Sequence, residues 1–189
     1  MLSVIIPTEG TEQPTVATLA ALVPGAAAGV VREVLLVDRV GDGVIERVAD
    51  VAGCRYLAFE GSRAAAMAAG ARQARSAWLM FLHAGAVLDA GWIDETAQFV
   101  QNVSLSGHSR AGIFRYAASP YTETGLREVL KSLDRLISGP SIDQGLLIAK
   151  DHYERLGGYT SDARRPELRF LRQLGRSSRT MLRSRIMVA

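Results

Sequence analysis

The sequence has few of the residues that bind metals or form disulfides. It contains one cysteine and three histidines in 189 residues. A single cysteine excludes an internal disulfide framework and any zinc site built on several cysteines. With so few nitrogen and sulfur ligands, a bound metal would have to rest on carboxylates.

Aromatic residues are also scarce, at 6% of the chain, whereas hydrophobic residues make up 48% and charged residues 22%. This composition predicts a folded globular protein whose core is aliphatic and rich in alanine. The length is that of one ordinary domain, and the chain has no repeat, low-complexity stretch or linker. We therefore expect a single domain over residues 1–189.

The chain has no uninterrupted apolar run long enough to suggest a membrane span. Its N-terminus lacks the basic region of a signal peptide. The uncharged stretch 13–31 is mostly alanine and threonine and contains Pro14, Pro24, Gly25 and Gly29, which argues against a membrane helix. We expect a cytoplasmic protein.

Lysine is nearly absent, and the arginines gather near the C-terminus. From Arg164 onward, eight arginines face one acid, Glu167, so this segment carries 8 − 1 = +7. The whole chain carries +3, which leaves 3 − 7 = −4 for residues 1–163. The segment is either a solvated surface or a contact for an anionic partner, such as a phosphate or the inner membrane surface. We do not expect nucleic-acid binding, because the segment has no run of aromatic residues for base stacking.

Short apolar runs alternate with helical patterns along the chain. We expect strands over 2–6, 34–37, 55–59, 78–82, 113–116 and 146–149, and a last one ending at 188. We expect helices over 15–22 (stopping before Pro24), 44–52, 62–75, 91–103, 122–137, 151–156 and 166–174. Strands separated by helices predict an α/β protein with a mostly parallel central sheet flanked by helices.

In such a sheet, ligands bind beyond the carboxyl ends of the strands. Asp38 ends the second strand, and its carboxylate is suited to accept hydrogen bonds from a ribose hydroxyl or a base N–H. The alternative is that Asp38 makes its hydrogen bonds within the protein and that Asp42 caps the next helix. Ser62 is the expected N-cap of a helix whose first amides, with Arg63, are suited to hold a diphosphate. The alternative is an ordinary capped surface helix.

Several short motifs in order resemble those of family 2 glycosyltransferases with the GT-A fold, in a compact bacterial subgroup. The first four are Ser3–Thr8, Glu33–Asp38, Gly61–Ala71 and Trp78–Ala84 with Leu88 and Gly91-Trp92. The last three are Asp143-Gln144-Gly145, Leu156–Tyr159 and Leu174-Gly175-Arg176.

The resemblance implies a nucleotide-diphosphosugar donor, an acceptor of unknown identity, and transfer with inversion. It implies Mg²⁺ or Mn²⁺ between the diphosphate and an aspartate after the fourth strand, and a later carboxylate as general base. Asp143 and Gln144 would lie on the acceptor side. The donor would be bound by Pro7, Thr8, Glu9, Asp38, Asp42, Arg63, Ala84 and Gly85.

The sequence departs from the family at three places. Glu9-Gly10 replaces an Asn-Glu pair, Gly85 replaces the metal-binding aspartate, and the segment with the general base is shortened. Counting forward from the Gly-Gly-aromatic turn places the base at Glu167, whereas counting backward from the last motif reaches Arg164.

Two interpretations of these departures remain open. In one, Arg164 and Arg165, with Arg63, replace the metal as fixed cations, and Glu167 or Asp162 is the base. In the other, the catalytic positions have decayed, and the protein only binds a nucleotide sugar or a partner. A nucleotidyltransferase fits less well, because no basic Gly-rich loop follows the first strand.

Overall fold

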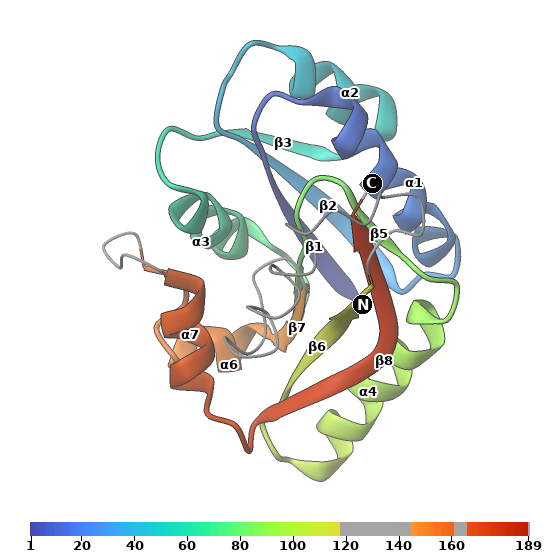
Figure 1. Ribbon diagram of the computed structural model, residues 1–189, viewed down its shortest axis with the longest axis vertical. Helices are drawn as coiled ribbons and strands as arrows, with labels where there is room; N and C mark the ends of the chain where they lie inside the picture. Colours follow the sequence, from blue (N-terminus) through green and yellow to red (C-terminus); the bar gives the residue numbers. More distant parts are fainter. Residues whose placement is uncertain (118–144, 161–165, 189) are drawn as a thin grey trace, which may run out of the picture.

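A computed structural model of the chain describes residues 1–117, 145–160 and 166–188. Its strands are β1 (Leu2–Thr8), β2 (Val31–Asp38), β3 (Arg55–Ala58), β4 (Trp78–Phe81), β5 (Ala86–Leu88), β6 (Ala111–Tyr116), β7 (Leu146–Ala149) and β8 (Arg179–Val188). Its helices are α1 (Glu12–Ala27), α2 (Val44–Ala52), α3 (Arg63–Gln73), α4 (Trp92–Ser106), α6 (Lys150–Arg155) and α7 (Pro166–Leu174). The predicted α/β class is confirmed, and Figure 1 shows the strands in one curled sheet between helices. The helix predicted over 122–137 lies outside the described residues.

The described strands form one sheet in the order β3-β2-β1-β4-β7-β6-β8-β5. Strands β3, β2, β1 and β4 are parallel, and β6 and β8 are parallel to each other. Strand β7 runs antiparallel between β4 and β6, and β5 runs antiparallel to β8. Because β7 reverses direction once, the carboxyl ends of β6 and β8 lie at the same edge of the sheet as those of β1, β2 and β4. We call this the carboxyl edge.

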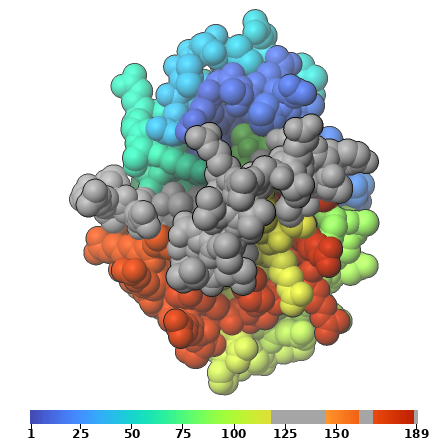
Figure 2. All heavy atoms as spheres, in the orientation of Figure 1, coloured from blue at the N-terminus to red at the C-terminus, as the bar shows by residue number. Residues whose placement is uncertain are grey.

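The strands are apolar on both faces because each face is covered by helices. One buried cluster joins the sheet to α1, α2 and α4, through Leu22, Ile45 and Trp92. The other joins it to α3, α6 and α7, through Met67, Tyr153 and Phe170. Figure 2 shows the N-terminal segments at one end of the molecule and α7 with β8 toward the other.

Four aromatic rings pack together where α6 and α7 meet the sheet. The rings of Phe81, Tyr153, Tyr159 and Phe170 pack with centroids 5.0 to 5.7 Å apart. The buried Tyr153 hydroxyl accepts a hydrogen bond from the Tyr159 amide at 2.9 Å, and burial raises the pKa of Tyr153 to about 12. This cluster fixes the start of α7 relative to β4.

Helix α1 differs from the prediction because it continues through Pro24 to Ala27. Proline removes the hydrogen bond to the carbonyl four residues earlier, but Ala20 and Pro24 are both exposed, so water can reach that carbonyl. The next residue, Gly25, lies directly against Trp92, which holds this end of α1 to the core. Among the described helices, none is long and apolar enough to cross a membrane.

The contact between α3 and β1 depends on Gly70. A Cβ atom at Gly70 would lie 2.6 Å from Cγ2 of Ile5, closer than packed atoms approach. Gly70→Ala should therefore push α3 off the sheet and lower the free energy of unfolding by about 1–3 kcal/mol. Gly91→Ala is the matched control, because its Cβ would make only 3.9 Å contacts. Urea unfolding measures both changes, and equal stability of the two variants would contradict this packing.

Strand β8 is anchored to α4 by Glu95. Its two carboxylate oxygens accept hydrogen bonds from the amides of Arg183 and Ser184, at 2.5 and 2.7 Å. Partial burial by itself would raise the pKa of Glu95, but these amides and the Ser184 side chain outweigh it and hold the pKa below its usual value. Glu95 thus stabilises the fold in its charged form.

The pKa of Glu95 is lower in the folded protein than in the unfolded chain, so its charged form stabilises the fold. This stabilisation is fully present at pH values above the unfolded-state pKa, and it is lost as the pH falls through the folded-state pKa. Glu95→Gln should therefore destabilise the protein at pH 7, and the difference from wild type should shrink below about pH 4. Urea unfolding at a series of pH values measures this difference. A difference that stays constant from pH 7 to pH 3 would show that the Glu95 charge does not anchor β8.

Candidate functional site

The carboxyl edge brings together Thr8 and Asp38, as the sequence predicts for neighbouring strand ends. They are register partners of β1 and β2, and the Thr8 hydroxyl donates to Oδ1 of Asp38 at 3.1 Å. Oδ2 of Asp38 accepts the Gly41 amide at 2.8 Å. Thr8 is 0% and Asp38 1% exposed. The Asp38 carboxylate therefore holds the chain's own loops, and in this structure it does not face solvent.

The surroundings of Asp38 are negatively charged. Tyr56, on β3, is partly buried, and its pKa is raised first by burial and then by the charges of Asp38, Glu46 and Asp42. Asp42 accepts the Val44 amide at 3.0 Å in the turn before α2, whose N-cap residue is Gly43. Pro7 lies beyond the last β1 residue that pairs with β4 and pairs only with Val37 of β2.

Arg39 links the loops that follow three strands, a role the sequence reasoning missed. Its Nη1 lies 2.6 Å from Oε1 of Glu9, and its Nε donates to the Gly61 carbonyl at 2.8 Å. Gly10, which has a φ of +72°, lies against Val40 and Asp42 at the same place. Because the Arg39 and Glu9 side chains are 27% and 69% exposed, the ion pair contributes little energy and chiefly sets loop positions.

Arg63 stands at the first turn of α3. The Ser62 hydroxyl accepts the Ala65 amide at 3.2 Å, so the predicted N-cap is confirmed. Arg63 is partly buried, and its Nε has no hydrogen-bond partner. Within the described ranges, the guanidinium also makes no ion pair. A cation beside a helix N-terminus is an arrangement that favours an anion.

The loop after β4 does not fit a divalent metal held by an aspartate. Gly85 is buried, has a φ of +93°, and donates its amide to the Pro14 carbonyl and to the Thr18 hydroxyl, each at 2.9 Å. Ala84 beside it is half-buried and supplies no ligand side chain. Across residues 1–117, 145–160 and 166–188, no three histidine, cysteine or acidic residues gather in a way that would hold a metal.

The remaining predicted residues are only partly described. Asp143, Gln144, Asp162, Arg164 and Arg165 lie outside the described residues. Glu167 belongs to the first turn of α7, and the structure describes its backbone only. Arg179, in the basic C-terminal segment, is structural, because its side chain donates to the Leu171 carbonyl and burial lowers its pKa.

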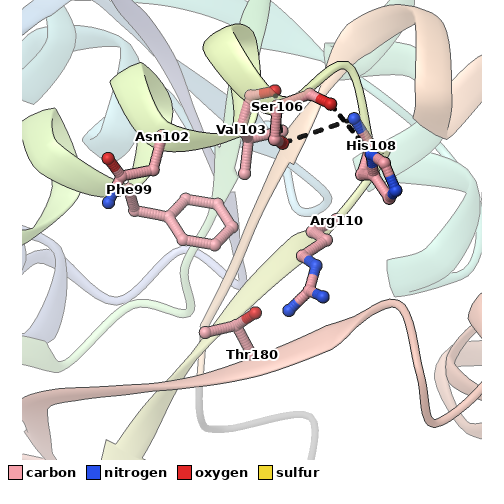
Figure 3. Close-up of a pocket in the computed structure, with 7 residues that line it drawn as sticks. All are labelled: Phe99, Asn102, Val103, Ser106, His108, Arg110 and Thr180. Carbon is pink, nitrogen blue, oxygen red and sulfur yellow. Dashed lines mark hydrogen bonds between the residues drawn. The ribbon is translucent and has the colours of Figure 1, made fainter.

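Two cavities lie away from the predicted donor residues. Figure 3 shows one of about 460 Å³ between the end of α4 and the starts of β6 and β8, at the edge opposite the carboxyl edge. Its residues include His108, whose Nδ1 is 2.8 Å from the Ser106 carbonyl oxygen, and Arg110. The other, of about 580 Å³, lies between the start of α4 and β8, beside Asp94 and Glu95.

Comparison with solved structures finds similar folds at low sequence identity. S. aureus TarS 1–349 matches 100% of this chain and 60% of its own, with a TM-score of 0.71 and 15% identity. The mannosyltransferase PcManGT from Pyrobaculum calidifontis, solved with GDP-Man and Mn²⁺, matches 100% of this chain and 56% of its own, with a TM-score of 0.68 and 17% identity. TarS 1–349 in complex with UDP-GlcNAc matches with a TM-score of 0.67 and 14% identity, over 100% of this chain and 58% of its own.

These likenesses show that the chain has the fold of GT-A-type glycosyltransferases, as the motifs predicted. The chain spans less than two thirds of the length of these proteins. No family model and no curated protein matches the sequence.

Substitution of Asp38 tests whether its hydrogen bonds stabilise the loops at the carboxyl edge. In Asp38→Asn, the amide group cannot accept from the Gly41 N–H and from Thr8 as the two carboxylate oxygens do. We expect the free energy of unfolding to fall by about 1–3 kcal/mol. Asp42→Asn is the matched control and should be near neutral, because the asparagine side-chain oxygen can accept the same Val44 amide. Urea unfolding of both variants measures this contrast, and equal losses would show that Asp38 is not the anchor.

Proposed function

We propose that the chain binds a nucleotide-diphosphosugar at the carboxyl edge and acts as a glycosyltransferase of family 2 type. The observation that carries this proposal is the GT-A fold over the whole chain, with TM-scores of 0.71 and 0.68 to TarS and PcManGT. The ligands of these two structures also support the proposal: PcManGT was solved with GDP-Man, and TarS was solved with UDP-GlcNAc. The edge offers Arg63 and the first turn of α3 to a diphosphate.

The positions of the described residues support one arrangement of the donor. The nucleoside lies over the loops that Asp38 and Arg39 hold at the ends of β1 and β2. The diphosphate then extends toward Arg63, whose guanidinium can donate several hydrogen bonds to it. The sugar points toward the end of β4 and the start of β7, which are register neighbours.

Transfer requires a base and a group that stabilises the leaving diphosphate. A carboxylate, Glu167 or Asp162, takes the proton from the acceptor hydroxyl, whose oxygen attacks the anomeric carbon with inversion. The bond from that carbon to the diphosphate oxygen breaks, and the electron pair leaves with the diphosphate. Arg63, with Arg164 and Arg165, neutralises the charge as fixed cations. No step is assigned to a metal, because the Gly85 loop supplies no carboxylate.

A second candidate function is a binding module without catalysis. The observations that favour it are the buried Asp38 carboxylate, which is occupied by the chain's own amides, and the glycine at position 85. Such a module would bind the nucleotide sugar and release no sugar from it.

Titration calorimetry with UDP and GDP, in EDTA and then in MnCl₂, tests donor binding. We expect binding in EDTA, because Arg63 is available to the diphosphate and the described residues hold no cluster of metal ligands. Arg63→Ala should weaken it roughly tenfold, since it removes a charged hydrogen bond. Arg72→Ala, at the exposed far end of α3, is the matched control and should bind as wild type does.

Three outcomes would count against the proposal as written. Failure of wild type to bind either nucleotide would remove donor binding, and binding that needs Mn²⁺ would remove the fixed-cation site. Release of UDP from UDP-GlcNAc or of GDP from GDP-mannose measures turnover. If the nucleotides bind but no release is seen, and Glu167→Gln changes nothing, the chain is a binding module.

A further inference from the structure

Two arginines lie side by side at the carboxyl edge, away from the candidate donor residues. Arg115 on β6 and Arg185 on β8 are register partners in a parallel pair. Register partners project to the same face of a sheet, and both residues are exposed. Like charges placed opposite each other destabilise a strand pair. Their pairing therefore calls for a compensating anion.

Among the described residues, two acids beside β8 bind its backbone and not these arginine side chains. Oδ2 of Asp89 accepts the backbone amide of Arg185 at 2.9 Å, and the Glu95 oxygens accept the amides of Arg183 and Ser184. Ion pairs in the described parts of the chain involve Arg39, Arg55 and Arg155. In those parts, the guanidinium groups of Arg115 and Arg185 have no acidic partner.

An irregularity in β8 produces this pairing. Ile113 pairs with Met181, whereas Arg115, two residues later, pairs with Arg185. The strand β8 thus has two extra residues here, and the amides of Arg183 and Ser184 donate to Glu95. Bulges of this kind redirect side chains and are common beside functional sites. Here the bulge places Arg185 opposite Arg115, and Glu95 holds the bulge.

The pair lies at the edge used by the proposed donor site but not within it. Three strand spacings of about 4.8 Å separate β6 from β1, so Arg115 is about 14 Å from the end of β1 along the sheet. Strands β4 and β7 lie between them, so the pair is on the side of the sheet beyond the ends at which the proposed sugar would lie.

We propose that Arg115 and Arg185 bind a phosphate group of the acceptor. Strand neighbours are close enough for two guanidinium groups to donate to one phosphate dianion, and two cations match its charge. The assignment to an acceptor rests on the proposed function. A soluble phosphate monoester and a lipid phosphate share this chemistry, so both are tested.

The probes are glycerol 3-phosphate, by calorimetry, and phosphatidylcholine vesicles with or without phosphatidic acid, by flotation. We expect wild type to bind at least one phosphate monoester, and Arg115→Gln and Arg185→Gln each to weaken this binding roughly tenfold. Arg110→Gln, an exposed charge at the opposite edge, is the matched control and should bind within about twofold of wild type. Binding to either probe, or to both, supports the site. Comparing the binding to glycerol 3-phosphate with the binding to phosphatidic acid vesicles then identifies the source of the phosphate.

Titration with UDP and GDP separates this site from the donor site. Both variants should bind these nucleotides as wild type does, and their Tm should be equal to or slightly above that of wild type, because one of two facing like charges is removed. If nucleotide affinity falls in parallel, the pair binds the donor and the acceptor assignment is wrong. If wild type binds neither phosphate probe, the site itself is wrong. If wild type binds no nucleotide but keeps arginine-dependent phosphate binding, the proposed function fails while the anion site stands.

Discussion

The Asp38 carboxylate fixes the carboxyl edge, because it is a charge almost removed from water where strand ends meet. A buried charge is tolerated only if hydrogen bonds replace the lost water. The Thr8 hydroxyl and the Gly41 amide supply those bonds, which join the end of β1 to the loop after β2. That loop then carries Arg39 to Glu9 and to the Gly61 carbonyl, so the position of the β3–α3 loop depends on Asp38 as well.

The sequence pattern correctly predicted those helices and strands whose ends are set by neighbouring residues. The helix over Val44–Ala52 and the strand over Leu146–Ala149 were predicted to the residue, because glycine turns bound or precede them. Strand β5 was missed, because three residues are too few for periodicity to show. The continuation of α1 past Pro24 depends on the packing of Gly25 against Trp92, which no local pattern contains.

In the candidate site, too, some features could be predicted from the sequence and others depend on tertiary packing. The meeting of Thr8 with Asp38 could be predicted, since the carboxyl ends of adjacent parallel strands must lie together. Their burial could not, because it depends on how the loops close over them. The partners of Arg39 come from loops after two other strands. The pairing of Arg115 with Arg185 depends on a bulge, and a bulge leaves no period in the sequence.

At the carboxyl edge, acidic and basic side chains have different partners. This difference relates the structure of the edge to the anionic ligands proposed for it. Asp38, Asp89 and Glu95 direct their carboxylates to backbone amides, so these acids are not available to pair with arginines. Arg63, Arg115 and Arg185 have no acidic partner in the described part of the chain. Unpaired arginines favour anions at these three positions, whereas the loops around Asp38 and Asp42 are negatively charged. Together with the glycine at position 85, the unpaired Arg63 is the basis of the proposal that fixed cations hold the diphosphate.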